Sequence, residues 1–129
     1  MDNLEDFMEK KKIKIKDREL EVWVARTMGE KQRGVSILNS LERTGMLFEF
    51  KIPMRYGFWM KGVKFPIDII WLRKNKIVGI TEDVPIGNGF SLLSLKAYYP
   101  PSPIDAALEL ASGAAAEMGL GVGDRMERK

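Results

Sequence analysis

The sequence predicts one mainly β domain, an antiparallel β-sandwich or open barrel with two short helices. Several short segments alternate apolar and polar residues at the period of a β-strand, and Gly and Pro separate them at short intervals. The long amphipathic helices that an α/β fold would require are missing. At 129 residues the chain is long enough for one such domain but not for two. We expect residues 1–11 to be a flexible lead-in and residues 12–129 to be the domain.

The predicted elements follow one another closely along the chain. They are a hairpin over 12–16 and 19–24, a short helix within 29–41, strands at 46–50 and 58–60, a second hairpin over 67–72 and 77–80, a strand at 107–110, and a short helix at 113–118. Thr27 and Ser112 are candidate N-caps for the two helices. Pro53 is expected to interrupt a strand, and Asn75 is the turn residue best able to take a positive φ. Residues 82–94 are predicted to form a loop because Gly and Pro are frequent there.

The composition excludes several kinds of chemistry. The chain has no cysteine and no histidine, so disulfides, thiolate nucleophiles, Cys/His zinc sites and His-based triads are ruled out. Any reaction would have to use carboxylates, Lys, Arg, Tyr, Ser or Thr. We therefore expect no metal site and no cofactor, and the sequence alone does not decide whether the protein is an enzyme.

The charge and hydropathy of the sequence indicate which binding partners and which cellular compartment to expect. The net charge of +3 is small, and the lysines of residues 10–16 alternate with isoleucines, as in a solvated strand face. This pattern argues against a nucleic-acid partner. Residues 1–6 are acidic, unlike a signal peptide, and no apolar run approaches the roughly 18 residues of a membrane span. We expect a cytoplasmic protein that does not enter membranes and is a monomer or weak homodimer.

Several segments together resemble the domain-of-unknown-function 192 (DUF192) family. They are Gly45-Met46-Leu47-Phe48, Phe58-Trp59-Met60-Lys61, Pro66-Ile67-Asp68-Ile69, Leu108-Glu109-Leu110, Ser112-Gly113 and Leu120-Gly121-Val122-Gly123-Asp124. In order and spacing the resemblance covers roughly residues 12–126. It implies a mainly β, sandwich-like domain and supplies no established reaction.

The sequence departs from the family pattern at two places. The family usually continues the Trp-Met-Lys motif with Asn-Thr, where this chain has Gly62-Val63. It usually carries Gly-Leu-Met in the first helix, where this chain reads Gly34-Val35-Ser36. If Asn-Thr supplies polar ligand contacts in relatives, those contacts are lost here. Many relatives also look exported, whereas this chain shows no signal sequence.

Trp59 and Lys61 are the first candidate site residues. They lie two positions apart, so on a strand they share a face and Met60 faces the other way. An indole beside an ammonium could hold a sugar or a small anionic molecule by stacking and charge. The alternative, favoured by the frequency of aromatics in cores, is that Trp59 is a core residue and Lys61 a residue at its rim.

Asp68 stands inside the apolar run 66–72, where an unpaired buried carboxylate would cost several kcal/mol. Water, a backbone N–H group or a cation such as Lys61, Lys64 or Arg55 must therefore satisfy it. Asp68 is then a pocket carboxylate that binds a hydroxyl or acts as a general base, a structural carboxylate that fixes the turn at 62–66, or simply an outward-facing strand residue. The structural interpretation is favoured, because structural ion-pair networks also perturb buried carboxylates.

The remaining polar candidates are weaker. Glu82 and Asp83 could coordinate a cation, but neighbours on an extended chain point apart, which favours a solvated loop. Tyr98-Tyr99 could wall a pocket or pack against the prolines that follow. Glu109 alternates as an outward strand residue would, although its place in the family pattern suggests a hydrogen-bonded role. Asp124 is expected to bond to the backbone of its own turn.

The leading functional hypothesis is a small-molecule binding module without catalysis, for a carbohydrate or small anion, with the 82–94 loop as a lid. Its predicted site residues are Trp59, Lys61, Asp68, Glu82, Tyr98 and Tyr99. One alternative is a hydrolase-like enzyme with Asp68 or Glu82 as general acid/base and Lys61 as electrostatic stabiliser. Another is a protein-interaction domain that docks a partner through a strand edge or an apolar patch.

Overall fold

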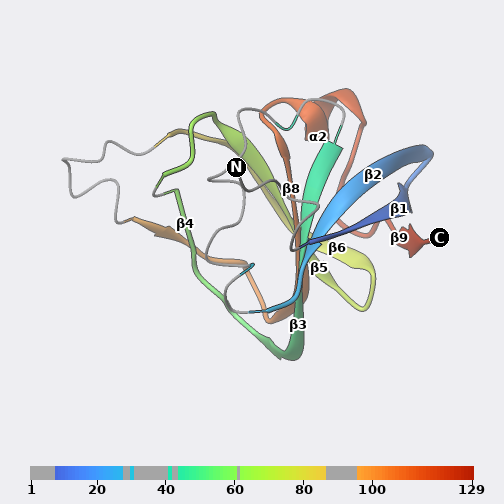
Figure 1. Ribbon diagram of the computed structural model, residues 1–129, viewed down its shortest axis with the longest axis horizontal. Coiled ribbons are helices and arrows are strands. Elements are labelled where there is room, and N and C mark those ends of the chain that lie inside the picture. Colours follow the sequence, from blue (N-terminus) through green and yellow to red (C-terminus); the bar gives the residue numbers. More distant parts are fainter. Residues whose placement is uncertain (1–7, 28–29, 31–40, 42–43, 61, 87–95) are drawn as a thin grey trace.

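The computed structural model describes residues 8–27, 30, 41, 44–60, 62–86 and 96–129. Within these ranges a large sheet is formed by β1 (Glu9–Ile15), β2 (Arg18–Ala25), β3 (Thr44–Met54), β5 (Ile67–Arg73), β6 (Lys76–Val84), β8 (Ile104–Ala111) and β9 (Met126–Arg128). A separate ribbon is formed by β4 (Phe58–Trp59) and β7 (Ala97–Tyr98), and one short helix, α2 (Ala114–Glu117), lies at one end of the sheet (Figure 1). The mainly β fold class is confirmed.

The large sheet has the strand order β6-β5-β8-β3-β2-β1-β9. Its neighbours are antiparallel with one exception, since β2 and β3 are parallel. This pair differs from the expected antiparallel pattern. Parallel neighbours need a crossover of a dozen or more residues, and residues 26–43 are long enough to make one.

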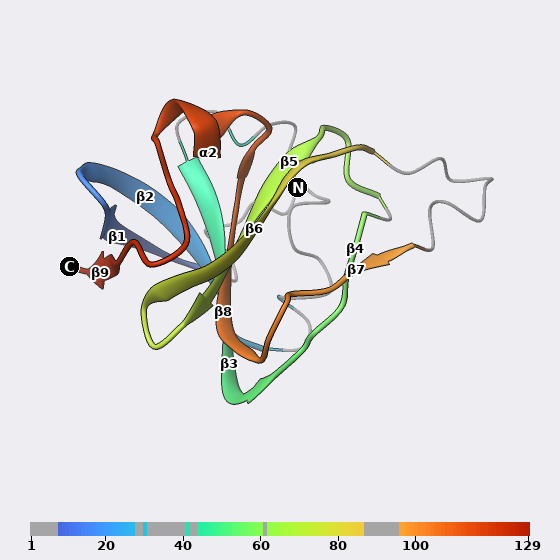
Figure 2. The ribbon, with the colours of Figure 1, turned by 180° about the vertical axis from the view of Figure 1, so that it is seen from behind.

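The C-terminal segment joins the two outer strands of the sheet and so curls it into an open barrel (Figure 2). On one side β9 pairs with β1. On the other side, backbone N–H groups of Ile77 and Met126 donate to the carbonyls of Asp124 and Asn75 at 2.9 and 2.8 Å, and Gly123 N–H donates to Ile77 at 2.8 Å. Strand β1 and the segment that leads into β9 therefore both take part in closing the barrel.

The sheet buries side chains on both faces. Inside the barrel lies an inner core that includes Ile13, Val24, Leu47, Leu72, Leu108, Ala115 and Met126. On the outer face lies an outer core that includes Trp23, Met46, Phe48, Met60, Ile69, Trp71 and Ala107. The β4–β7 ribbon covers part of this outer core, where the Phe58 ring meets Phe48 and Trp71 edge-on at centroid distances of 5.1 and 5.3 Å.

Both predicted hairpins are present. In the first, Ile15 pairs with Arg18, so the turn residues are 16–17, one position earlier than expected, and β1 starts ahead of the predicted boundary at residue 12. In the second, Lys74 and Asn75 both have positive φ, 50° and 63°. Two such residues give the turn twist that a right-handed hairpin favours, which confirms the expectation for Asn75.

Two predicted interruptions are wrong. Pro53 does not end its strand, because β3 continues to Met54 through a stretch where pairing with β8 is irregular and a missing N–H is tolerated. The loop predicted from residue 82 begins later, since β6 runs to Val84 and contains Glu82 and Asp83. Asp83 has φ 53° at a bulge in the β5–β6 pairing. Residues 87–95 of that predicted loop lie outside the described residues.

The first predicted helix start is confirmed by a capping box. Thr27 Oγ1 accepts a hydrogen bond from Glu30 N–H at 3.1 Å, and Glu30 Oε1 accepts from the N–H groups of Arg26 and Thr27 at 2.9 and 3.0 Å. Thr27 is therefore an N-cap, as its position predicted. The rest of the predicted helix, apart from Glu30 and Leu41, lies outside the described residues.

The second helix is present, but its predicted cap is wrong. Gly113, with φ 91°, occupies the N-cap position of α2. Ser112 instead donates its hydroxyl to Asp83 Oδ1 at 2.6 Å. Gly119, at φ 66°, follows the helix as expected, and Asp124 accepts a bond from Gly121 N–H at 2.8 Å in the final turn. Among the described residues no helix has the length and hydropathy needed to cross a membrane.

Gly79 marks a tight contact between β6 and the proline-rich corner that precedes β8. A Cβ at this position would lie 2.7 Å from Cγ and 2.8 Å from Cδ of Pro101. The pyrrolidine ring is rigid, so the backbone would have to move. We expect Gly79→Ala to lower the free energy of unfolding by about 2 kcal/mol, measured by urea denaturation. Gly121→Ala is the control, because its Cβ would meet no atom closer than 4.0 Å; equal losses in both would contradict the prediction.

Candidate functional site

The two faces of the β4–β7 ribbon differ in exposure. Phe58 pairs with Tyr98, and both pack against the outer core. Trp59 pairs with Ala97 and points away from the core, with 57% of its surface exposed. Met60 is 4% exposed and belongs to the outer core, so it faces opposite to Trp59 as its position predicted. The alternative in which Trp59 is a core aromatic is therefore wrong.

Tyr99 lies on the same face as Trp59. Continuing the ribbon register places Tyr99 opposite Gly57, which is two residues from Trp59. A Cβ on Gly57 would lie 2.8 Å from Cε1 and 2.9 Å from Cζ of Tyr99, so the ring rests against the Gly57 backbone. Tyr99 is also 57% exposed. Two large aromatic rings thus present surface to solvent from one face of the ribbon.

We call Trp59, Tyr99, Gly57 and Ala97 the aromatic platform. The large residues occupy one diagonal of the four positions and the small residues the other, so each ring has room to lie across the ribbon. Tyr98 faces the opposite side, where its ring meets Lys96 Nζ at 5.0 Å from the centroid. Exposed aromatic faces can stack on flat or apolar ligand surfaces.

Lys61 and Glu82 are two other predicted site residues. Lys61 lies outside the described residues. Glu82 is exposed on β6. Within the described residues no three acidic side chains converge as a metal site would require.

Asp68 is completely buried and is satisfied by backbone N–H groups (0% exposed). Oδ1 accepts from Asp83 at 2.8 Å, and Oδ2 accepts from Gly113 and Ala115, each at 3.0 Å. Of the partners considered from sequence, the backbone is the one found. The carboxylate ties β5 to the β6 bulge and to the first turn of α2, rather than to the turn at 62–66. The structure does not bring it to the platform.

Glu109 is the residue that the sequence prediction placed wrongly. Its side chain is 4% exposed, between Met46 and Ile69 on the neighbouring strands of the outer-core face. β8 is a central strand with both faces covered, so alternation does not place this residue in solvent. Burial raises the pKa of the Glu109 carboxyl to about 8. Its place in the family pattern was the one sequence signal for a special role.

The fold and the platform define a small single-domain open β-barrel with an aromatic ribbon on its outer face. A family model for DUF192, described as an uncharacterized ACR, matches residues 10–128. The chain belongs to this family, as the sequence motifs predicted. No curated protein matches the chain significantly.

Two solved structures share this fold. A proposed transcription regulator from Sinorhizobium meliloti 1021 superposes with a TM-score of 0.83 at 23% identity, covering 94% of this chain and 95% of its own. A protein of unknown function from Novosphingobium aromaticivorans DSM 12444 gives a TM-score of 0.80 at 24% identity, covering 90% and 83%. At these identities the similarity establishes the fold alone.

Proposed function

We propose that this protein is a small-molecule binding module that holds a carbohydrate on its aromatic platform. The observation that carries the proposal is the pair of half-exposed rings, Trp59 and Tyr99, on one face of the ribbon. Exposed single apolar residues are ordinary, but two large aromatics set side by side on a short ribbon need an explanation. The apolar C–H face of a sugar ring is a suitable partner for such rings.

The proposed function is binding without catalysis. The hydrolase-like alternative requires Asp68 or Glu82 at the ligand, and Asp68 has no exposed surface. Both of its oxygens also accept hydrogen bonds from backbone N–H groups. The platform supplies aromatic contact area and contains no carboxylate, which favours binding over turnover.

Trp59 fluorescence provides the test. All three tryptophans lie in the described part of the chain, and Trp59 is exposed while Trp23 and Trp71 are 9% and 0% exposed. Titration with glucose, maltose and N-acetylglucosamine should therefore change the Trp59 signal saturably. We expect Gly57→Ala to weaken binding by about tenfold, because the added Cβ pushes the Tyr99 ring off the ribbon without removing any aromatic group.

Val122→Ala is the matched control, since Val122 is a 73% exposed apolar residue in the turn before β9. It should bind like wild type. Circular dichroism would verify that each variant is folded. The proposal fails if no saccharide gives saturable quenching, or if Gly57→Ala binds as tightly as Val122→Ala.

A further inference from the structure

The end of the barrel away from α2 carries a second set of chemical groups, unrelated to the platform. α2 lies near the start of β3 and the end of β8, where Met46 pairs with Glu109. Glu49 lies further along β3, on the inner-core face, at the opposite end of the barrel. Arg26 directly follows the parallel strand β2, and Arg128 reaches the same place from β9.

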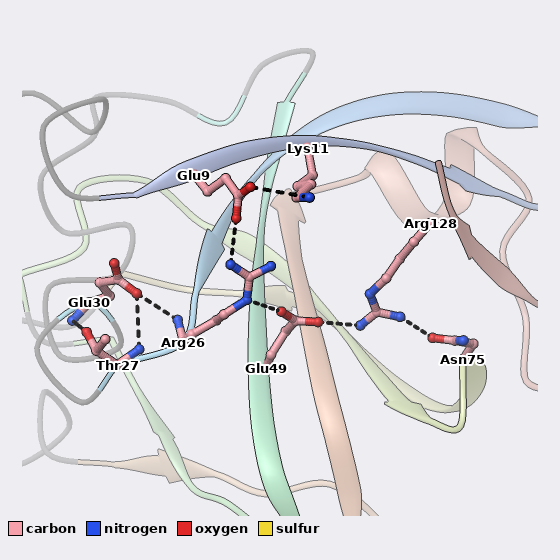
Figure 3. Close-up of polar contacts among 8 residues, drawn as sticks. All are labelled: Glu9, Lys11, Arg26, Thr27, Glu30, Glu49, Asn75 and Arg128. Atoms are coloured by element: carbon pink, nitrogen blue, oxygen red, sulfur yellow. Dashed lines mark hydrogen bonds and ion pairs between the residues drawn. The ribbon is translucent and has the colours of Figure 1, made fainter.

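These side chains form a continuous polar network (Figure 3). Arg26 Nε donates to Glu49 Oε1 at 2.7 Å, and Arg128 Nη2 donates to Glu49 Oε2 at 2.6 Å. Arg26 Nη1 also donates to Glu9 at 2.6 Å, and Arg128 Nη1 donates to Asn75 Oδ1. Glu49 is therefore one carboxylate held between two guanidiniums. Its burial opposes ionisation, but the hydrogen bonds from Arg128 and Arg26 hold its pKa below the ordinary value.

A cavity of about 90 Å³ opens beside this carboxylate. The residues that line it are Lys11, Ile13, Val24, Arg26, Leu47, Glu49, Arg128 and Lys129. Four of these are cations and one is a carboxylate, and the remaining three are apolar inner-core residues. Apolar walls lower the local dielectric, which strengthens attraction between the cations and a bound anion.

Each of the two guanidiniums has one nitrogen that is not used in these hydrogen bonds. Within the described residues, Arg26 Nη2 and Arg128 Nε have no hydrogen-bond partner, although the other nitrogens of both groups are bonded. Figure 3 places the two guanidiniums on either side of Glu49, with Lys11 beside Glu9. Lys11 Nζ is 3.3 Å from Glu9 and is half-exposed, so it can turn toward the cavity. Three cationic donors thus surround a space of the size of one tetrahedral oxyanion.

We propose that this cavity binds a single phosphate group between Arg26 and Arg128. Guanidinium forks match the oxygen geometry of phosphate, and charge-assisted hydrogen bonds are the strong ones. Glu49 acts as an internal competitor that holds the two arginines in place and lowers the affinity. The phosphate can be inorganic or part of a phosphomonoester, because the cavity accommodates one such group.

The test is isothermal titration calorimetry with inorganic phosphate at fixed ionic strength, with glycerol phosphate as the phosphomonoester arm. Wild type should bind saturably, Arg128→Gln should bind about tenfold more weakly, and Glu49→Gln should bind more tightly because two guanidiniums are released. Arg18→Gln is the control, an exposed arginine at the start of β2 that should behave like wild type. Lys11→Gln replaces Arg128→Gln if circular dichroism finds the latter unfolded.

Saturable binding of either probe that is weakened in Arg128→Gln and unchanged in Arg18→Gln would support the site. The arm that binds more tightly would identify the source of the phosphate. Absence of saturable heat from both probes at millimolar concentration would overturn the proposal. Equal weakening in Arg128→Gln and Arg18→Gln would also overturn it, because only general charge screening would then be acting.

Discussion

Replacing Asp68 with Asn is expected to lower the free energy of unfolding by about 3 kcal/mol. The carboxylate accepts three backbone hydrogen bonds in a fully buried position. An amide offers one oxygen, and its NH₂ group would face N–H donors that it cannot satisfy. Urea denaturation followed by circular dichroism measures the loss. The effect should include early exposure of α2, because two of the three N–H donors, those of Gly113 and Ala115, belong to its cap and first turn.

Asp105→Asn is the matched control for this experiment. Asp105 also accepts from a backbone N–H, that of Lys74 at 3.1 Å, but at a partly exposed position where water can replace the bond. We expect it to change stability by less than about 0.5 kcal/mol. An Asp68→Asn protein as stable as Asp105→Asn would show that the buried carboxylate does not hold the β5, β6 and α2 elements together.

Because Glu109 is buried, we expect the free energy of unfolding to fall as the pH rises. Burial raises its folded-state pKa from the ordinary 4.5 to about 8, so between these values the folded state holds one proton more than the unfolded state. This contribution is fully present below pH 4.5 and is lost as the pH rises through about 8. The loss is at most on the order of 5 kcal/mol. Chemical denaturation at a series of pH values measures it.

Glu109→Gln separates this carboxyl from every other titrating group. Glutamine has nearly the same shape and stays neutral, so the variant should be more stable than wild type at pH 8 and show a flatter pH dependence between pH 5 and 8. Glu127→Gln, at an exposed position of β9, should keep the wild-type dependence. A wild-type slope in the Glu109→Gln protein would mean that Glu109 ionises without penalty in the folded state.

The local elements of this fold follow from local signals. The hairpin at Asn75, the capping box at Thr27 and the glycine that ends α2 all depend on residues within a few positions of one another. The closure of the barrel does not, because the backbone groups of Ile77 and Asp124 that meet there are far apart in the sequence. Backbone hydrogen bonds carry no side-chain pattern, so the sequence offers no sign of this contact.

In the candidate site, too, the sequence predicted what depends on a single strand and missed what depends on how strands pair. Alternation predicted that Trp59 and Met60 face opposite sides, and this needs only the strand itself. The choice between Tyr98 and Tyr99 required the pairing with Gly57, which depends on register. For Glu109, the alternation of apolar and polar residues predicted a solvent-exposed side chain, but the side chain is buried. The pattern along one strand does not show that β8 lies in the middle of a sheet covered on both faces.

The pairing of β9 with β1 has a consequence for biosynthesis. Ile13 pairs with Arg128 and Ile15 with Met126, so one edge of β1 pairs with residues that are synthesised long after β1 itself. Until then the outer edge of β1 has no partner from β9. The lysines at positions 10–12 and 14 lie on this strand, and such charges disfavour pairing between the unpaired strand edges of nascent chains. We therefore expect these lysines to limit association between incomplete chains until the barrel closes.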